Sequence, residues 1–215
     1  SMISNRYARA NNIYMGNEFD CNIPSSYIIY LDMNNLYGGA MQSYLPTKQF
    51  RWSQNLDLSV EYIQSLSDEA DEGMILEVDL EYPAELHELH NDLPVAPEQM
   101  KVQFNMLSPY SQRAAAPLNV SNNYNVSKLI PNLNDKCRYI LHYRNLKLYL
   151  NLGLKMTKIH KILLFKQEPW LRAYINFNTN MRKNATNSFD KDFWKLMNNA
   201  VFGKSMENVR NRLNV

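Results

Sequence analysis

The sequence predicts an α+β fold: a sheet of mixed or antiparallel strands with helices, and a basic two-helix projection near the C-terminus. Residues 74–81 alternate between apolar and polar side chains, as a half-buried strand does. Residues 169–205 instead space their apolar side chains at helical intervals. A chain of 215 residues, 45% of them hydrophobic and 20% charged, is long enough to bury one good core.

Two strands are predicted in the first half of the chain. Residues 27–31 form a short run of β-branched and aromatic residues between Pro24 and Asn34. This run predicts a buried strand with Asp32 at its C-terminal end. Residues 74–81 predict a second strand, which places four apolar side chains on one face: Met74, Leu76, Val78 and Leu80.

The middle of the chain predicts an irregular segment followed by a helix. Residues 108–135 mix Pro, Ser and Asn and predict a long irregular excursion. From Lys136 the pattern predicts a helix that ends near Gly153, a suitable C-terminal residue because glycine accepts a positive φ. One face of this helix would carry Tyr139, Tyr143, Leu146 and Leu150.

The last third predicts a strand followed by a helical hairpin. Residues 157–165 favour a strand, and Pro169 stands where a helix could begin. A second helix would be capped by Asn187 or Ser188, with two aspartates in its first turn. The short link at residues 184–188 predicts that the two helices pack side by side.

The net charge of +2 conceals a strong asymmetry along the chain. Residues 1–135 carry 7 Lys/Arg and 17 Asp/Glu, whereas residues 136–215 carry 16 Lys/Arg and 4 Asp/Glu. A basic half is typical of proteins that bind nucleic acids or nucleotides, although two oppositely charged surfaces could also attract each other.

Composition also restricts the cellular setting. No apolar run reaches the roughly 18–20 residues that span a membrane, so no membrane partner is expected. Two cysteines far apart in sequence do not form a disulfide framework. We therefore expect an intracellular protein, nuclear, cytoplasmic or virus-associated.

A first candidate site surrounds Asp32. A carboxylate at a strand end beside a turn is well placed to hold Mg²⁺, and Gly38 and Gly39 leave the following backbone open to phosphates. An aspartate in this position is also common as a plain turn or helix-cap residue. The isolated pattern leaves both interpretations open.

A second candidate site lies on the last predicted helix. At ~100° per residue, five apolar residues form one face of this helix: Phe193, Leu196, Met197, Ala200 and Val201. The opposite side carries a stripe of Lys191, Lys195, Asn199 and Phe202, called here the lysine stripe. Cations suit a triphosphate and an aromatic ring suits stacking, whereas the competing interpretation is an ordinary solvated helix face.

Together the two segments resemble motifs A and B of family B DNA polymerases. Asp32, Leu36 and Tyr37 match Asp-x-x-Ser-Leu-Tyr, and Lys195, Asn199 and Gly203 match Lys-x-x-x-Asn-Ser-x-Tyr-Gly, with Phe202 in the tyrosine position. Further segments are similar to the protein-primed branch found in Polinton/Maverick elements and related viruses: residues 34–38, 45–47, 93–98, 107–110, 142–146 and 195–199.

The resemblance covers roughly residues 5–215 and implies a DNA-directed DNA polymerase that binds dNTP, Mg²⁺ and primer-template DNA. Asp32 would bind two catalytic Mg²⁺ ions, with the carbonyl of Met33 contacting one. Tyr37, beside Leu36, would stack beneath the incoming sugar and exclude a ribose 2′-hydroxyl. Lys195 would hold the triphosphate, with Lys191 and Arg182 as weaker candidates. The remaining motif residues would line the nascent base pair: Asn199, Phe202 and Gly203.

The resemblance also implies an organisation into three parts. Residues 1–49 would be a palm segment with motif A, and residues 167–215 the fingers hairpin with motif B. Residues 50–166 would continue the palm and include an insertion that contacts primer DNA and a terminal priming protein.

The sequence departs from the motifs at several positions. Asn35, Gly38, Gly39 and Ala200 replace the commoner Ser, Pro, Trp and Ser. No Tyr-x-Asp-Thr-Asp-like motif follows residue 204, and no exonuclease acidic motif precedes Asp32. We therefore expect weak Mg²⁺ binding and no useful turnover from this chain alone.

Two other interpretations remain at this point. The chain could be a polymerase remnant that acts as a non-catalytic nucleic-acid or protein-binding module, or a plain structural domain with an accidental charge asymmetry. His87 and His90 share the spacing of zinc ligands on a helix, but no cysteine or carboxylate cluster completes four ligands, which favours a polar surface helix.

Overall fold

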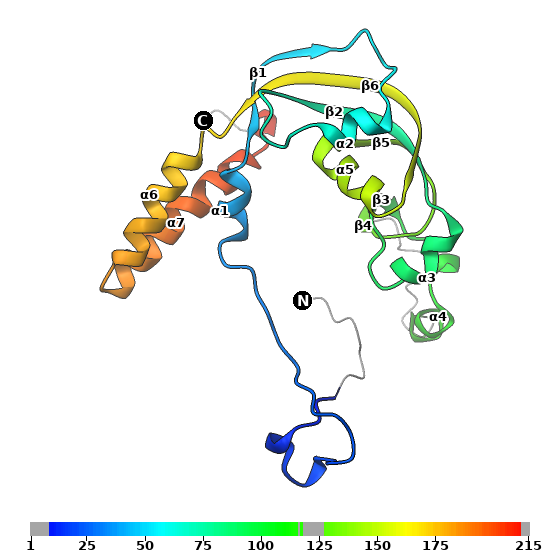
Figure 1. Ribbon diagram of the computed structural model, residues 1–215, viewed down its shortest axis with the longest axis vertical. Helices are drawn as coiled ribbons and strands as arrows, with labels where there is room; N and C mark the ends of the chain where they lie inside the picture. The colour runs from blue at the N-terminus through cyan, green and yellow to red at the C-terminus, as the bar shows by residue number, and fades with distance from the viewer. Residues whose placement is uncertain (1–8, 116, 118–126, 212–215) are drawn as a thin grey trace. The chain divides into compact units, whose positions relative to one another are not determined.

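The computed structural model describes residues 9–115, 117 and 127–211 and has a mixed α+β architecture (Figure 1). The chain divides into two compact units. Ser1–Ser43 with Pro169–Val215 form the helical unit, and Tyr44–Glu168 form the sheet unit. The α+β fold class predicted from the sequence is therefore confirmed.

The sheet unit is built on a curled four-stranded antiparallel sheet with strand order β1-β6-β2-β5. Its longest pairing runs between β2 and β6, from Glu72 opposite Lys166 to Glu81 opposite Lys155. A second, two-stranded antiparallel sheet pairs β3 with β4. The strands are β1 (Leu45–Trp52), β2 (Glu72–Glu81), β3 (Glu98–Lys101), β4 (Ser127–Ile130), β5 (Lys136–His142) and β6 (Lys155–Glu168).

The hydrophobic core lies between the concave face of the larger sheet and two helices. Helices α2 (Val60–Ser65) and α5 (Tyr143–Asn151) cover this face (Figure 1). The alternation predicted for β2 is confirmed, because four inward side chains are buried: Met74, Leu76, Val78 and Leu80. They pack with the fully buried Ile63 of α2 and with Tyr143 and Leu146 of α5.

Short helices connect the strands of the sheet unit. They are η2 (Ala84–Leu86), α3 (His87–His90), η3 (Phe104–Met106) and α4 (Pro109–Ala115). The excursion predicted for residues 108–135 is therefore partly regular, since it contains α4 and β4. Residues 116 and 118–126 of that excursion lie outside the described residues.

A buried lysine joins the two sheets. The side chain of Lys136, on β5, is fully buried, and its Nζ donates to Oε2 of Glu98 at 3.0 Å and to Oδ1 of Asn132 at 2.5 Å. Burial alone would raise the pKa of the Glu98 carboxyl, but hydrogen bonds from Asn132 and Lys136 outweigh it and lower that pKa. The network anchors β3 beside β5.

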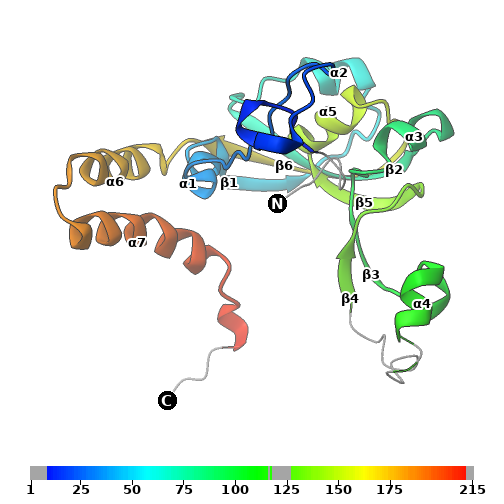
Figure 2. The same cartoon turned by 90° about the horizontal axis from the view of Figure 1, so that it is seen from below.

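The helical unit consists of an N-terminal turn, a short helix and a helical hairpin. Its helices are η1 (Ile13–Glu18), α1 (Leu36–Met41), α6 (Arg172–Asn184), α7 (Ser188–Ser205) and η6 (Val209–Asn211). Helices α6 and α7 run side by side in opposite directions (Figure 2), which confirms the predicted hairpin. The predicted cap is also confirmed, because the side chain of Asn187 accepts from the backbone N–H of Asp190 at 2.8 Å.

Two predictions of secondary structure are wrong. Residues 27–31 form no strand, and all five are exposed, so Asp32 does not end a buried strand. A β-branched run needs neighbouring strands for its backbone groups, and no strand ladder forms in the described part of the helical unit. Residues 136–142 are strand β5 rather than the first part of a helix, which begins only at Tyr143.

The two candidate zinc ligands hold the local fold instead. Nδ1 of His90 lies 2.7 Å from the hydroxyl of Tyr82, and Nε2 of His87 lies 3.2 Å from the Tyr82 carbonyl oxygen. Because His90 is buried, α3 is not a wholly polar surface helix. Cys21 and Cys137 are both free and exposed, and no described helix is long and apolar enough to cross a membrane.

Candidate nucleotide site on helices α1 and α7

The segment after Asp32 turns sharply into helix α1. Asn35 adopts the left-handed conformation, with φ 55° and ψ 44°, and its carbonyl oxygen accepts from the Gly39 N–H at 2.9 Å. The Asn35 side chain folds back against Gly38, where a Cβ would come within 2.2 Å of it. A side chain at position 38 would therefore displace that of Asn35, whereas a Cβ at Gly39 would meet no atom within 4 Å. The turn points Tyr37 out of the first turn of α1, with its side chain 55% exposed.

The α6–α7 hairpin is held together by buried polar contacts as well as apolar ones. Nδ2 of Asn178 donates to Oδ1 of Asn198 at 2.9 Å, and both amides are buried. The Tyr174 hydroxyl donates to the carbonyl oxygen of Met197 at 3.2 Å. Paired amides of this kind fix the helices in one register, because a shift would leave buried polar groups unsatisfied. Sequence patterns gave no signal for the Asn178–Asn198 pair.

Helix α7 does not bury the apolar face that the sequence predicted. Met197 and Val201 do face inward, but Leu196 is 62% exposed and Ala200 is also exposed. The side chains that are at least half-buried in the middle of the helix are Trp194, Met197, Asn198 and Val201. Helix α7 is thus rotated about its own axis relative to the prediction. The amide of Asn198 faces inward, where it is hydrogen-bonded to Asn178, and Leu196 faces outward.

The lysine stripe lies on a surface that is largely open. Lys191, Lys195 and Asn199 are exposed, and Phe202 is half-buried. Within the described residues no ion pair joins Lys191 or Lys195 to a carboxylate. At 1.5 Å per residue, Lys195 lies about 10 Å along the helix from Phe202, and Lys191 about 16 Å. Arg182, in the last turn of α6, lies near the tip of the hairpin where the two helices are joined.

The structure brings the two motif-like segments into contact through their aromatic rings. The rings of Tyr37 and Phe202 stack with their centroids 4.2 Å apart and their planes inclined by 12°. Helix α6 is linked to the end of α1 as well, because Nε of Arg172 donates to the carbonyl oxygen of Gln42 at 3.0 Å. The sequence placed Tyr37 and Phe202 in one site through motif resemblance, but not in direct contact.

Two of the remaining candidate residues adjoin Tyr37 and Phe202 in sequence, and two others precede α1. Leu36 precedes Tyr37 in α1, and Gly203 follows Phe202 in α7. Asp32 and Met33 lie four and three residues before α1 in exposed, non-helical backbone. The Asp32 carboxylate is therefore accessible to a cation, and the described residues contain no group of three or more His, Cys, Asp or Glu side chains that would surround one.

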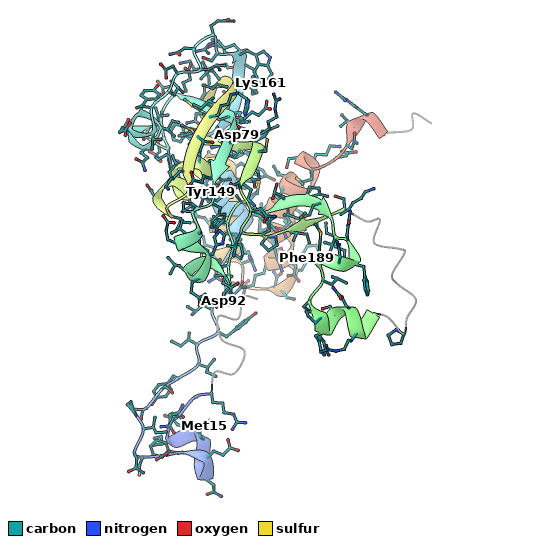
Figure 3. The ribbon with its side chains drawn as sticks, turned by 90° about the vertical axis from the view of Figure 1, so that its right-hand side faces the viewer. Met15, Asp79, Asp92, Tyr149, Lys161 and Phe189 are labelled. Atoms are coloured by element: carbon teal, nitrogen blue, oxygen red, sulfur yellow. The ribbon has the colours of Figure 1, made fainter. Side chains whose placement is uncertain are left out.

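The sheet unit contains a separate hollow that sequence patterns did not indicate. It has a volume of about 470 Å³ and is lined by Trp52, Ser53, Leu56, His160, Lys161 and Ile162. Nε2 of His160 lies 2.8 Å from Oδ1 of Asp79, and Figure 3 labels Asp79 and Lys161 on this sheet. The backbone N–H of Arg138, followed by His160, lowers the pKa of Asp79. The pair organises the sheet surface but shares no residue with the α1–α7 contact.

Comparisons with known proteins add no further assignment. No protein-family model matches the sequence, and no match is found among curated proteins or solved structures.

Proposed function

We propose that this chain is the nucleotide-binding part of a DNA-directed DNA polymerase of the protein-primed family B type. The observation that carries the proposal is the stack of Tyr37 on Phe202, which joins the motif A-like turn to the motif B-like helix within one unit. These two segments are far apart in sequence, yet the resemblance assigns both to the same nucleotide.

The open side of α7 supplies the chemistry that a triphosphate needs. Lys195, two turns before Phe202, would contact the phosphates as a flexible point charge, with Lys191 one turn further. Tyr37 would meet the sugar, since its ring is braced from one side by Phe202 and exposed on the remainder. Asn199 and Gly203 lie near Phe202 along α7 and would contact the base pair.

Asp32 would supply one carboxylate to a Mg²⁺ ion bound with the triphosphate. Two Mg²⁺ ions would activate the primer 3′-hydroxyl and neutralise the leaving pyrophosphate when the full reaction runs. Because Asp32 is exposed and the described residues contain no group of three or more His, Cys, Asp or Glu side chains, the ion would be held mainly by the nucleotide. The 215-residue chain is therefore expected to bind nucleotide without incorporating it.

Primer-template DNA provides a direct test of the proposal. Binding should weaken as salt rises, and replacing both Lys191 and Lys195 by Ala should reduce the slope of log K against log salt by about 1–2. Lys183→Ala, at an exposed lysine outside the lysine stripe, is the control and should leave the slope unchanged. No DNA binding at low salt would refute the proposal.

The alternative is a non-catalytic module that binds nucleic acid or protein. The exposed Asp32 and the small residues Gly39 and Ala200 favour it. The two proposals differ in nucleotide selectivity: a nucleotide site should prefer dNTP to NTP, and Tyr37→Ala should remove the preference. Equal binding of dNTP and NTP by the unaltered chain would favour the module.

A further inference from the structure

Helix α7 has three distinct faces, and only two of them have been assigned. One face packs toward α6 through Trp194, Asn198 and Val201, and another carries the lysine stripe. The third face is apolar and is called here the α7 seam. Its residues are Phe189, Phe193, Leu196, Ala200 and Gly203.

The α7 seam is exposed along the whole helix. Phe189 is 76% exposed, Leu196 62% and Phe193 41%, and Ala200 and Gly203 are exposed as well. A Cβ at Gly203 would meet no atom within 4 Å, so no packing within the described residues requires a glycine there. Figure 3 labels Phe189, which begins the seam at the N-terminal end of the helix. An aromatic-rich face of this length is unusual on a surface that meets only water.

The spacing of the seam is that of a helix that pairs with another helix. Its residues follow one another at intervals of four, three, four and three, which is the heptad repeat of packed helices. Their sizes are graded, with two phenylalanines at the N-terminal end and alanine and glycine at the C-terminal end. A second α7 in antiparallel orientation would place Phe189 against Gly203 and Phe193 against Ala200, with Leu196 meeting its equivalent at the centre.

The charges beside the seam select the same orientation. Asp190 follows Phe189, and Lys204 follows Gly203, so both occupy the same flanking position of the repeat. In an antiparallel pair these positions face each other, and two Asp190–Lys204 ion pairs form. In a parallel pair each of these positions would instead face the opposite flank of the partner helix, so that Lys204 would lie beside Asn199 and no Asp190–Lys204 pair would form. Lys204 already pairs with Glu207 in the same chain, but its side chain remains 62% exposed and can accept a second carboxylate.

We infer that the α7 seam is the contact surface for a second copy of this chain, in an antiparallel pair whose twofold axis passes beside Leu196. The centre of the seam lies more than a quarter-turn around the helix from the centre of the lysine stripe, at ~100° per residue. Pairing would leave Lys191 and Lys195 exposed, but it would bury Gly203, a residue of the candidate nucleotide site, against Phe189 of the second copy.

Sedimentation of the purified chain from about 5 to 500 µM tests the inference. The apparent mass should rise with concentration from 25.2 kDa toward twice that value. Leu196→Glu should keep the chain monomeric throughout, with unchanged helicity because the side chain is exposed. Leu89→Glu, at another exposed leucine on α3, is the matched control and should dimerise normally.

The charges provide a test of the orientation. Asp190→Lys or Lys204→Asp alone should weaken dimerisation by about tenfold, and the double exchange should restore it. A chain that is monomeric at all concentrations, or a dimer insensitive to Leu196→Glu, would overturn the inference. A dimer that the double exchange does not restore would overturn the antiparallel pairing.

Discussion

The contact between Tyr37 and Phe202 should appear as a measurable coupling free energy. Stacked aromatic pairs contribute about 0.5–1.5 kcal/mol beyond the area that they bury. Since Tyr37 remains 55% exposed, we expect the lower part of this range, about 0.5–1 kcal/mol. The perturbation is a double-mutant cycle of Tyr37→Ala, Phe202→Ala and the combined variant.

Urea unfolding can measure this coupling if the signal comes from the helical unit alone. Trp170 and Trp194 lie in that unit, so the cycle is built in a Trp52→Phe background and followed by tryptophan fluorescence. With a slope near 1.5 kcal/mol/M, the coupling corresponds to roughly 0.3–0.7 M in the midpoint. Tyr37→Ala combined with Phe177→Ala is the control, because Phe177 packs on Trp194 instead. Additive effects in the Tyr37–Phe202 cycle would refute the contact.

Three further predictions concern folding. Glu98→Gln should destabilise the sheet unit by about 2–3 kcal/mol in urea unfolding, because it leaves Lys136 buried without its carboxylate, and adding Lys136→Met should recover most of this loss. Burial, followed by the nearby Arg144 charge, lowers the pKa of His142 to about 4. The unfolded chain therefore binds a proton first as the pH falls, and stability should be constant above about pH 6.5 and drop by about 1–2 kcal/mol toward pH 4. In His142→Asn the side-chain oxygen can replace Nδ1 of His142, which accepts from the Arg144 N–H at the start of α5. This variant should flatten that part of the profile; an unchanged profile would contradict the assignment. Replacing Gly153, whose φ is 99°, by Ala should lower the free energy of unfolding by about 1–2 kcal/mol. Gly39→Ala should leave stability unchanged or raise it, as measured by thermal unfolding.

The sequence predicted the elements whose patterns are strictly local. The alternation of residues 74–81 gives β2 because one face is buried and the other solvated. The capping asparagine and the short link give the α6–α7 hairpin for the same local reason. Lys136–His142 escaped prediction because Tyr139 and Tyr143 are four apart, which fits one face of a helix as well as a strand that leads into a helix.

The parts of the site that depend on tertiary packing could not be predicted. The periodic apolar residues of α7 indicated an inward face, but the buried amide of Asn198 turns the helix so that Leu196 is exposed. Residues 27–31 have strong strand propensity, which specifies a strand only where a neighbouring strand is present. The resemblance to motifs A and B implies that Tyr37 and Phe202 serve one site, but the stacking of their rings depends on tertiary packing.

The central proposal is that α1 and α7 form one nucleotide site, and equilibrium titration of the chain with dNTP and Mg²⁺ tests it most directly. Lys195→Ala should weaken binding by about tenfold, the value of one charge-assisted phosphate contact of ~1.4 kcal/mol. Lys183→Ala, at an exposed lysine in the last turn of α6, is the control and should bind as the unaltered chain does. Equal affinities of all three chains, or no dNTP binding by any of them, would contradict the proposal.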